Sequence, residues 1–120
     1  MKQKVHSVSY LAKAEFELKN GVYDLVALPC GAEVVKATLE VVGNPTAGNI
    51  YIGFKDATDI QKNHLFVLEN VETNKNATSA KDYTATSNKV IAAEVKNANG
   101  NTNCVLRVLY FLPSVIEVEY

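Results

Sequence analysis

The stretch VYDLVALPCGAEVVKATLEVV, residues 22–42, decides the fold because it holds two apolar runs joined by a Pro-Cys-Gly corner. Pro29 lacks the backbone donor that a strand ladder needs, and Gly31 tolerates a positive φ, so the corner ends one strand before the next begins. Apolar and polar residues then alternate through Glu33–Val42, as in a strand with one buried face. The core positions expected from this alternation are Val35, Ala37, Leu39 and Val41.

Short segments of the same kind recur along the whole chain, separated by Asn, Gly and Pro. This spacing is typical of an all-β sandwich or barrel, and no stretch shows a sustained helical stripe or an internal repeat. We therefore predict a single-domain antiparallel β-sandwich, jelly-roll-like, with about eight strands. The expected strands lie within residues 5–18, 22–28, 33–42, 50–55, 64–68, 81–86, 89–95, 104–112 and 115–120.

The connections are expected from polar and turn-forming residues. Asn20-Gly21 favours a tight turn between strands. Residues 56–63 are predicted as a surface loop or one helical turn, residues 69–79 as a long exposed loop, and residues 97–103 as a hairpin loop.

Length and charge limit the possible functions. The chain has 120 residues, which fits one domain over 1–120, with residues 1–9 as a possible N-terminal arm or edge strand. Twelve basic and thirteen acidic residues leave a net charge of -1, so we expect no nucleic-acid partner and no anionic membrane surface. The first residues lack the apolar core of a signal peptide, and the apolar run near the C-terminus is too short to span a bilayer.

The residues that usually carry chemistry are few and scattered. His6 and His64 have no metal-ligand spacing, and Cys30 and Cys104 form no C-x-x-C pair and have no neighbouring histidine. We expect no metal, no cofactor and no enzymatic activity, while a disulfide between the two cysteines remains open.

Tyrosines occur on nearly every predicted strand. Such residues suit protein interfaces, because the ring buries well and the hydroxyl tolerates water, but they also suit cross-strand packing. Both roles stay open for Tyr10, Tyr23, Tyr51, Tyr83, Tyr110 and Tyr120.

The succession of strand, Leu-Pro-x-Gly-Ala corner, long apolar strand and Ile-Gly strand leading into an Asp-containing turn resembles small β-sandwich structural proteins of tailed bacteriophages. The resemblance covers roughly residues 22–60, together with the β-rich segment CVLRVLYF. The matching residues are Leu28, Pro29, Gly31, Ala32, Ile52, Gly53, Asp56 and Asp59.

The resemblance implies a virion component and, within that class, a capsid decoration or cement protein. Such proteins sit on the outer capsid surface, often as homotrimers, and clamp neighbouring subunits of the major capsid protein. The resemblance also implies that the chain is made in the host cytoplasm. The chain lacks the stalk repeats of a fibre, and this favours cement over fibre.

Interface residues are expected at the two ends of the chain and on the strand at 104–112, which is apolar on both faces. One face of that strand can be buried between subunits around a threefold axis. The predicted interface residues are Val5, His6, Tyr10, Arg107, Leu109, Phe111, Val118 and Tyr120.

Two other classes of function stay open. A receptor- or carbohydrate-binding sandwich, as in a head fibre or tail-associated protein, is favoured if Tyr51, Tyr83 and residues 69–79 gather on one concave surface. A small enzyme or a domain of a larger assembly is the third class, since one fold hosts all three.

Overall fold

The computed structural model describes residues 2–6, 8–56, 59–79, 83–100, 102–113 and 115–119, with side chains placed for residues 5, 8–55, 66–79, 83–100 and 102–113. Within these residues the protein is all β, with eleven strands. No helix in this part is long and apolar enough to cross a membrane.

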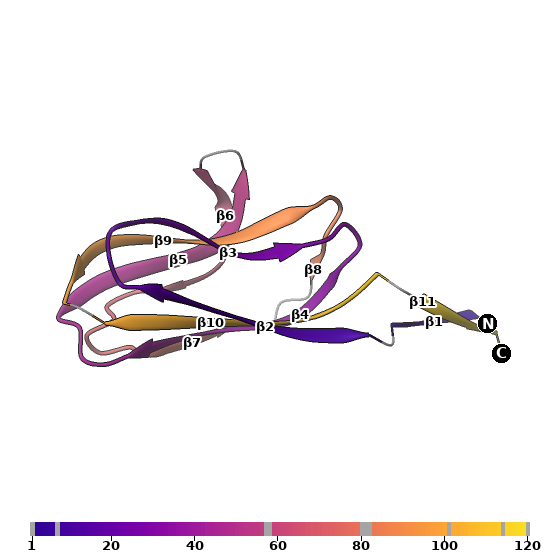
Figure 1. The fold of residues 1–120 in the computed structure, drawn as a ribbon, viewed down its shortest axis with the longest axis horizontal. Helices are drawn as coiled ribbons and strands as arrows, with labels where there is room; N and C mark the ends of the chain where they lie inside the picture. The colour runs from indigo at the N-terminus through magenta and orange to yellow at the C-terminus, as the bar shows by residue number, and fades with distance from the viewer. Residues whose placement is uncertain are drawn as a thin grey trace.

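Nine of the strands form two antiparallel sheets that pack face to face (Figure 1). The five-stranded sheet has the order β2-β10-β4-β7, with β8 pairing to β4, and the four-stranded sheet has the order β3-β9-β5-β6. The five-stranded sheet comprises β2 (Ser9–Glu17), β4 (Glu33–Val42), β7 (Asn76–Ser79), β8 (Tyr83–Thr84) and β10 (Asn103–Phe111). The four-stranded sheet comprises β3 (Gly21–Leu28), β5 (Ala47–Asp56), β6 (Asp59–Leu68) and β9 (Lys89–Asn99).

The strand pairing confirms the predicted sandwich and shows a jelly-roll order. The chain forms one long hairpin that is rolled up, so that β5 pairs with β6, β4 with β7, β3 with β9, and β2 with β10. These successive pairs fall alternately in the two sheets, so β2, β3, β4 and β5 lie in alternate layers, as do β8, β9 and β10. One further pair, β1 (Lys2–His6) with β11 (Val115–Glu119), continues the hairpin beyond the sandwich.

The core lies between the two sheets and is built from the inward positions of each strand. The alternation of β10 and β4 supplies fully buried residues such as Leu106 and Leu39, and β5 and β9 supply Ile52 and Ile91 from the opposite sheet. Burying each of these side chains stabilises the fold by about 1.5–3 kcal/mol. The core therefore holds the sheets together without a disulfide between the two cysteines, which are both free.

One predicted core position on β4 is wrong. The register between β10 and β4 shifts at Leu109 and Tyr110, so that a β-bulge leaves Val35 without an opposite residue. The bulge reverses the alternation on its N-terminal side, and Val34 is buried where Val35 was expected. The alternation is confirmed at Ala37, Leu39 and Val41.

Part of the range 56–63 is strand and not the predicted loop or helical turn: Asp56 ends β5 and pairs with Asp59, where β6 begins and continues to Leu68. Residues 57 and 58 lie outside the described residues. β6 is the edge strand of its sheet, where polar residues are tolerated because one backbone edge faces solvent.

Other connections also differ from expectation. Asn20-Gly21 and residues 97–103 join strands of opposite sheets, so neither forms a hairpin between paired strands. Within 69–79 the chain is not wholly exposed, since Val71 is buried and Asn76–Ser79 forms β7. The segment predicted as one strand over 5–18 is split between β1 and β2.

Candidate functional site

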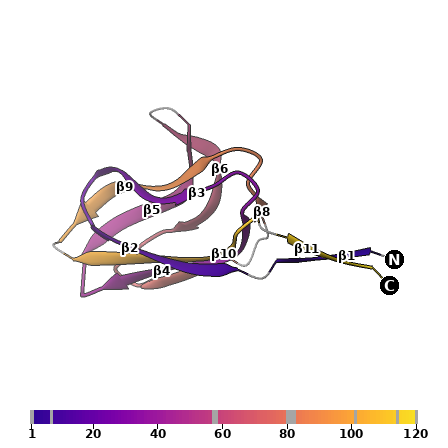
Figure 2. The same ribbon diagram turned by 45° about the vertical axis from the view of Figure 1, so that its right-hand side comes forward.

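β1 and β11 form a two-stranded antiparallel ribbon that extends away from the sandwich and carries both chain ends near its tip (Figures 1 and 2). Along the ribbon, pairs of opposite charge alternate with pairs that include an apolar residue. The charged pairs are Lys2 with Glu119 and Lys4 with Glu117, and the other pairs are Gln3 with Val118 and Val5 with Ile116.

The base of the ribbon is fixed to the sandwich by backbone contacts. The Leu112 amide donates to the Val8 carbonyl at 2.8 Å. Val8 lies just before β2 and Leu112 just after β10, where the two segments of the chain pass between the sandwich and the ribbon. Next to this point Gly31 has a φ of 88°, and its amide donates to the Ala85 carbonyl at 2.7 Å. A β-carbon at residue 31 would lie 2.8 Å from the β-carbon of Pro113, so the corner and the ribbon base are in direct contact.

Cys30, which lies in the corner at residues 29–31, is held by two hydrogen bonds. The Cys30 amide donates to Oδ1 of Asn88 at 2.9 Å, and its thiol donates to the Thr86 carbonyl at 3.4 Å. Cys104 lies in the core, where burial raises its pKa from 9.0 to about 11. The Cys30 thiol is therefore at the surface, whereas the Cys104 thiol is buried and held in its neutral form.

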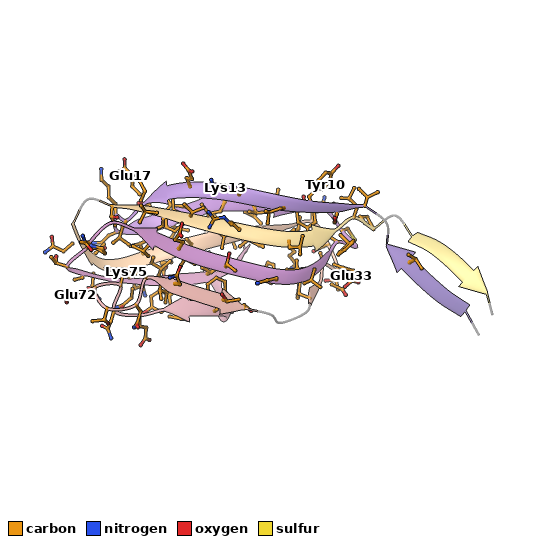
Figure 3. All side chains as sticks on the ribbon, turned by 90° about the horizontal axis from the view of Figure 1, so that it is seen from below. Tyr10, Lys13, Glu17, Glu33, Glu72 and Lys75 are labelled. Atoms are coloured by element: carbon orange, nitrogen blue, oxygen red, sulfur yellow. The ribbon has the colours of Figure 1, made fainter. Side chains whose placement is uncertain are left out.

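The outer face of the five-stranded sheet changes character along its length (Figure 3). Nearest the ribbon is the row of Ser9, Phe111 and Glu33, followed by the row of Leu11, Leu109 and Lys36, in which two leucines lie beside a lysine. Next come the basic row of Lys13, Arg107 and Thr38 and the row of Glu15, Val105 and Glu40, in which a valine lies between two carboxylates.

The charges in these rows form long, partly exposed ion pairs. Nζ of Lys13 lies 3.7 Å from Oε1 of Glu15, and Nη1 of Arg107 lies 3.7 Å from Oε1 of Glu40. Pairs of this kind contribute about 0–1 kcal/mol to stability, since water screens them. They remain available to exchange partners.

Four of the predicted interface residues lie on β2 and β10 of the sandwich. The Tyr10 side chain is 50% exposed, and its ring centroid lies 5.9 Å from that of Tyr110. Leu109 and Phe111 are half-buried on the outer face of β10, and Arg107 is half-buried in its ion pair. The structure thus brings Tyr10, Leu109 and Phe111 to the ribbon end of the five-stranded sheet, whereas Arg107 lies at the middle of β10, opposite Lys13 and Thr38.

The other four predicted residues belong to the two chain ends. Val5 is half-buried in β1, and His6 and Val118 are described as backbone positions of the ribbon only. Tyr120 lies outside the described residues.

Two exposed apolar residues in this region were missed by the sequence prediction. Leu11 is 63% exposed and Val8 is 39% exposed. The alternation of β2 indicated that Leu11 faces outward, but this signal was hidden because residues 5–18 were treated as a single strand. We use the name apolar collar for the cluster at the ribbon base formed by Val8, Tyr10, Leu11, Val35, Leu109 and Phe111.

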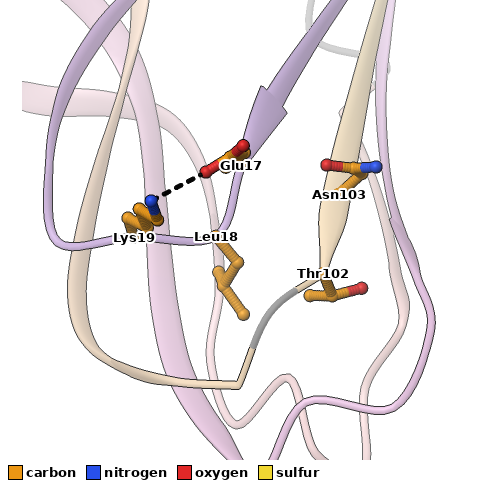
Figure 4. A pocket seen from close by; sticks show the side chains of 5 residues that line it. All are labelled: Glu17, Leu18, Lys19, Thr102 and Asn103. Atoms are coloured by element: carbon orange, nitrogen blue, oxygen red, sulfur yellow. Dashed lines mark ion pairs between the residues drawn. The ribbon is translucent and has the colours of Figure 1, made fainter.

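Two shallow hollows lie at the opposite end of the sandwich. The first has a volume of about 340 Å³ and includes the ion pair between Glu17 and Lys19, whose charged atoms are 3.1 Å apart (Figure 4). The second, of about 410 Å³, is lined by amides and hydroxyls. Among the residues with described side chains, no three His, Cys, Asp or Glu residues gather closely enough to hold a metal ion.

The arrangement that would favour carbohydrate binding is not found. Tyr83 packs inward on Phe54, with ring centroids 4.4 Å apart. Tyr51 alternates with the buried Ile50 and Ile52 on β5, so it faces the outside of that sheet, beneath the Lys96 ammonium at 5.5 Å. The two tyrosines therefore do not share a surface.

Comparison with known proteins points to phage capsids. A chain in the acidic stable capsid structure of Helicobacter pylori bacteriophage KHP30 is 64% identical, with 100% of both chains covered and a TM-score of 0.90. The chain belongs to the family of this phage capsid protein. It is a virion structural protein, and the predicted phage identity is confirmed to that extent.

More distant matches support the fold of this capsid protein family. A chain of the cyanophage Pam1 capsid asymmetric unit is 21% identical over 88% of this chain and 85% of the other, with a TM-score of 0.59. A chain of the capsid of Ralstonia phage GP4 is 14% identical over 92% and 88%, with a TM-score of 0.63. No protein-family model and no curated protein sequence matches the chain.

Proposed function

We propose that this virion structural protein decorates the outer surface of a phage capsid and stabilises it by binding across neighbouring subunits of the major capsid protein, as a trimer. The observation that carries the proposal is the ribbon of β1 and β11, which projects from a compact sandwich in a chain of a phage capsid family. The role is structural and needs no catalytic group or cofactor.

The ribbon is suited to binding because it has little support of its own. Within the described residues β1 and β11 pair only with each other, and a lone two-stranded ribbon is marginally stable in water. Each strand has a second backbone edge, which can add to a strand of a neighbouring protein. A partner that covers the apolar positions Val5, Ile116 and Val118 stabilises the ribbon further.

The shape of the molecule supports a clamp between subunits. The protein measures 56 × 27 × 19 Å, with the ribbon along the long direction (Figure 1). The two described hollows are shallow and polar and lie at the end remote from the ribbon. Binding through an extended edge and a broad surface suits a second protein better than a small molecule.

The direct test is co-sedimentation of the purified full chain with capsids that lack this protein. We expect saturable binding in a fixed ratio to the capsid subunit and a higher melting temperature of the capsid. A chain that stays in the supernatant at every concentration contradicts the proposal.

A truncated chain tests the role of the ribbon. The arm predicted over residues 1–9 includes Ser9, which begins β2, and Val8, whose carbonyl accepts from Leu112, so the cut belongs before Val8. A chain of residues 8–113 retains every residue of the described core. We expect it to fold and to lose capsid binding, and a truncated chain that still saturates capsids refutes the role of the ribbon.

A further inference from the structure

The apolar collar concentrates exposed apolar side chains in one place. Four of the seven exposed large hydrophobic residues on the described surface belong to it, and three of these lie within residues 8–11. Single exposed apolar residues are normal in soluble proteins, whereas a contiguous group marks an interaction surface. The apolar collar therefore has the character of a surface that binds a partner.

The collar also wraps around an edge strand. By the alternation along β2, Tyr10 lies on the same face of the strand as the buried Phe16, and Leu11 lies on the opposite face. The start of β2 is therefore apolar on both faces. β2 is the edge of the five-stranded sheet. An apolar edge of this kind promotes association unless another chain covers it.

The surroundings of the collar have the arrangement of a subunit interface. Interfaces between identical subunits have an apolar centre rich in aromatic residues and a charged rim. The collar contains Tyr10 and Phe111, and charged residues border it directly: Glu33 lies opposite Phe111, Lys36 lies opposite Leu109, and Lys13 and Arg107 form the next row.

The rim carries both signs of charge in adjacent rows. The basic row of Lys13 and Arg107 is followed by the acidic positions Glu15 and Glu40, so one copy of the surface offers each sign that another copy requires. Both ion pairs within the chain are 3.7 Å long and partly exposed, and they can exchange for pairs between subunits.

We infer that the apolar collar is the surface through which copies of this chain pack against one another. The occupant is a second copy, because the surface is apolar at its centre and complementary to itself at its rim. The inference rests on the trimer of the proposed function and assigns its contact. A closed ring of copies gathers the collars around the symmetry axis, with the ribbons starting beside it.

The test is the solution mass of the full chain and of matched variants in the absence of capsids. We expect the wild-type protein to be an oligomer, and Leu11→Lys to raise its dissociation constant about 30-fold or more. Leu11 is 63% exposed, so the variant is expected to fold, and circular dichroism checks this. Val8→Lys, at a side chain 39% exposed, is the second variant and acts in the same direction.

Val42→Lys is the matched control. Val42 is 50% exposed on the same sheet but at the end remote from the ribbon, opposite Asn103, so the oligomer is expected to remain intact. A monomeric wild-type protein, a Leu11→Lys oligomer of unchanged strength, or an equal effect of Val42→Lys overturns the inference.

Capsid binding separates this inference from the proposed function. A wild-type oligomer that does not bind capsids refutes the decoration role but leaves the apolar collar as the contact between subunits. A wild-type monomer that saturates capsids refutes the collar and leaves decoration intact.

Discussion

Replacing Gly31 by alanine is expected to destabilise the fold through two separate effects. The residue has a φ of 88°, in the left-handed region, where a β-carbon costs about 1–2 kcal/mol. The added carbon would also lie 2.8 Å from Cβ of Pro113, well inside the 3.4 Å at which ordinary contact begins. Relieving that overlap in a packed region costs about 1–2 kcal/mol more. The expected total is about 2–4 kcal/mol.

A double-mutant cycle distinguishes the two effects. Pro113→Gly removes the contacting β-carbon but leaves the backbone of residue 31 unchanged, so Gly31→Ala in that background is expected to cost only about 1–2 kcal/mol. The effect of Pro113→Gly itself cancels in the cycle.

The assay is denaturant unfolding of the four proteins at one fixed protein concentration, because self-association shifts apparent stability. Equal costs of Gly31→Ala in both backgrounds would refute the contact between the corner and the ribbon base. A cost below about 0.5 kcal/mol in the wild-type background would refute the strain argument as well.

Four further predictions concern the core, the two thiols, the pH dependence of stability and the surface. Leu106→Ala is expected to cost about 3–5 kcal/mol in the same unfolding assay, since Leu106 is fully buried on a central strand. At neutral pH a thiol reagent is expected to label Cys30 in the native protein and Cys104 only after unfolding. Because burial raises the Cys104 pKa, the folded protein keeps the thiol proton to a higher pH than the unfolded chain does, so the free energy of unfolding is expected to decrease between pH 9.0 and about 11. In the Cys104→Ala variant this decrease is expected to be absent. Asp24→Asn removes a pair with Lys55 at 3.0 Å, and its cost is expected to stay below about 1 kcal/mol because the carboxylate is exposed.

The sequence predicted the architecture well because the jelly roll depends on short alternating strands and on where they stop. The corner at residues 29–31 and the alternation at Ala37, Leu39 and Val41 are both local properties. They follow from the backbone chemistry of proline and glycine and from the two-residue period of a strand.

The sequence predictions were wrong at positions whose conformation depends on contacts with distant parts of the chain. The bulge at Val35 depends on the pairing of β4 with β10, about seventy residues away, so no local pattern reveals it. The polar sequence of 59–63 forms a strand because β5 supplies a partner on one side and solvent satisfies the other. Turn-forming residues at 20–21 mark the end of a strand but do not specify which sheet the next strand joins.

The candidate site was predicted in part. Tyr10, Leu109 and Phe111 were chosen from aromatic and apolar character, and the structure places them at one end of one sheet. Leu11 was missed because its exposure depends on the break between β1 and β2, for which the sequence contains no proline or glycine.

The nested pairing of the strands has a consequence for biosynthesis. Lys2 pairs with Glu119, and every pair further in joins positions closer together, so the β5 and β6 hairpin is the first that a growing chain can form. Pairing between distant segments is slow, since a large loop must close before any contact forms. The ribbon cannot form until residues 115–119 have left the ribosome, so it is the last of the nested pairs to become available to the growing chain.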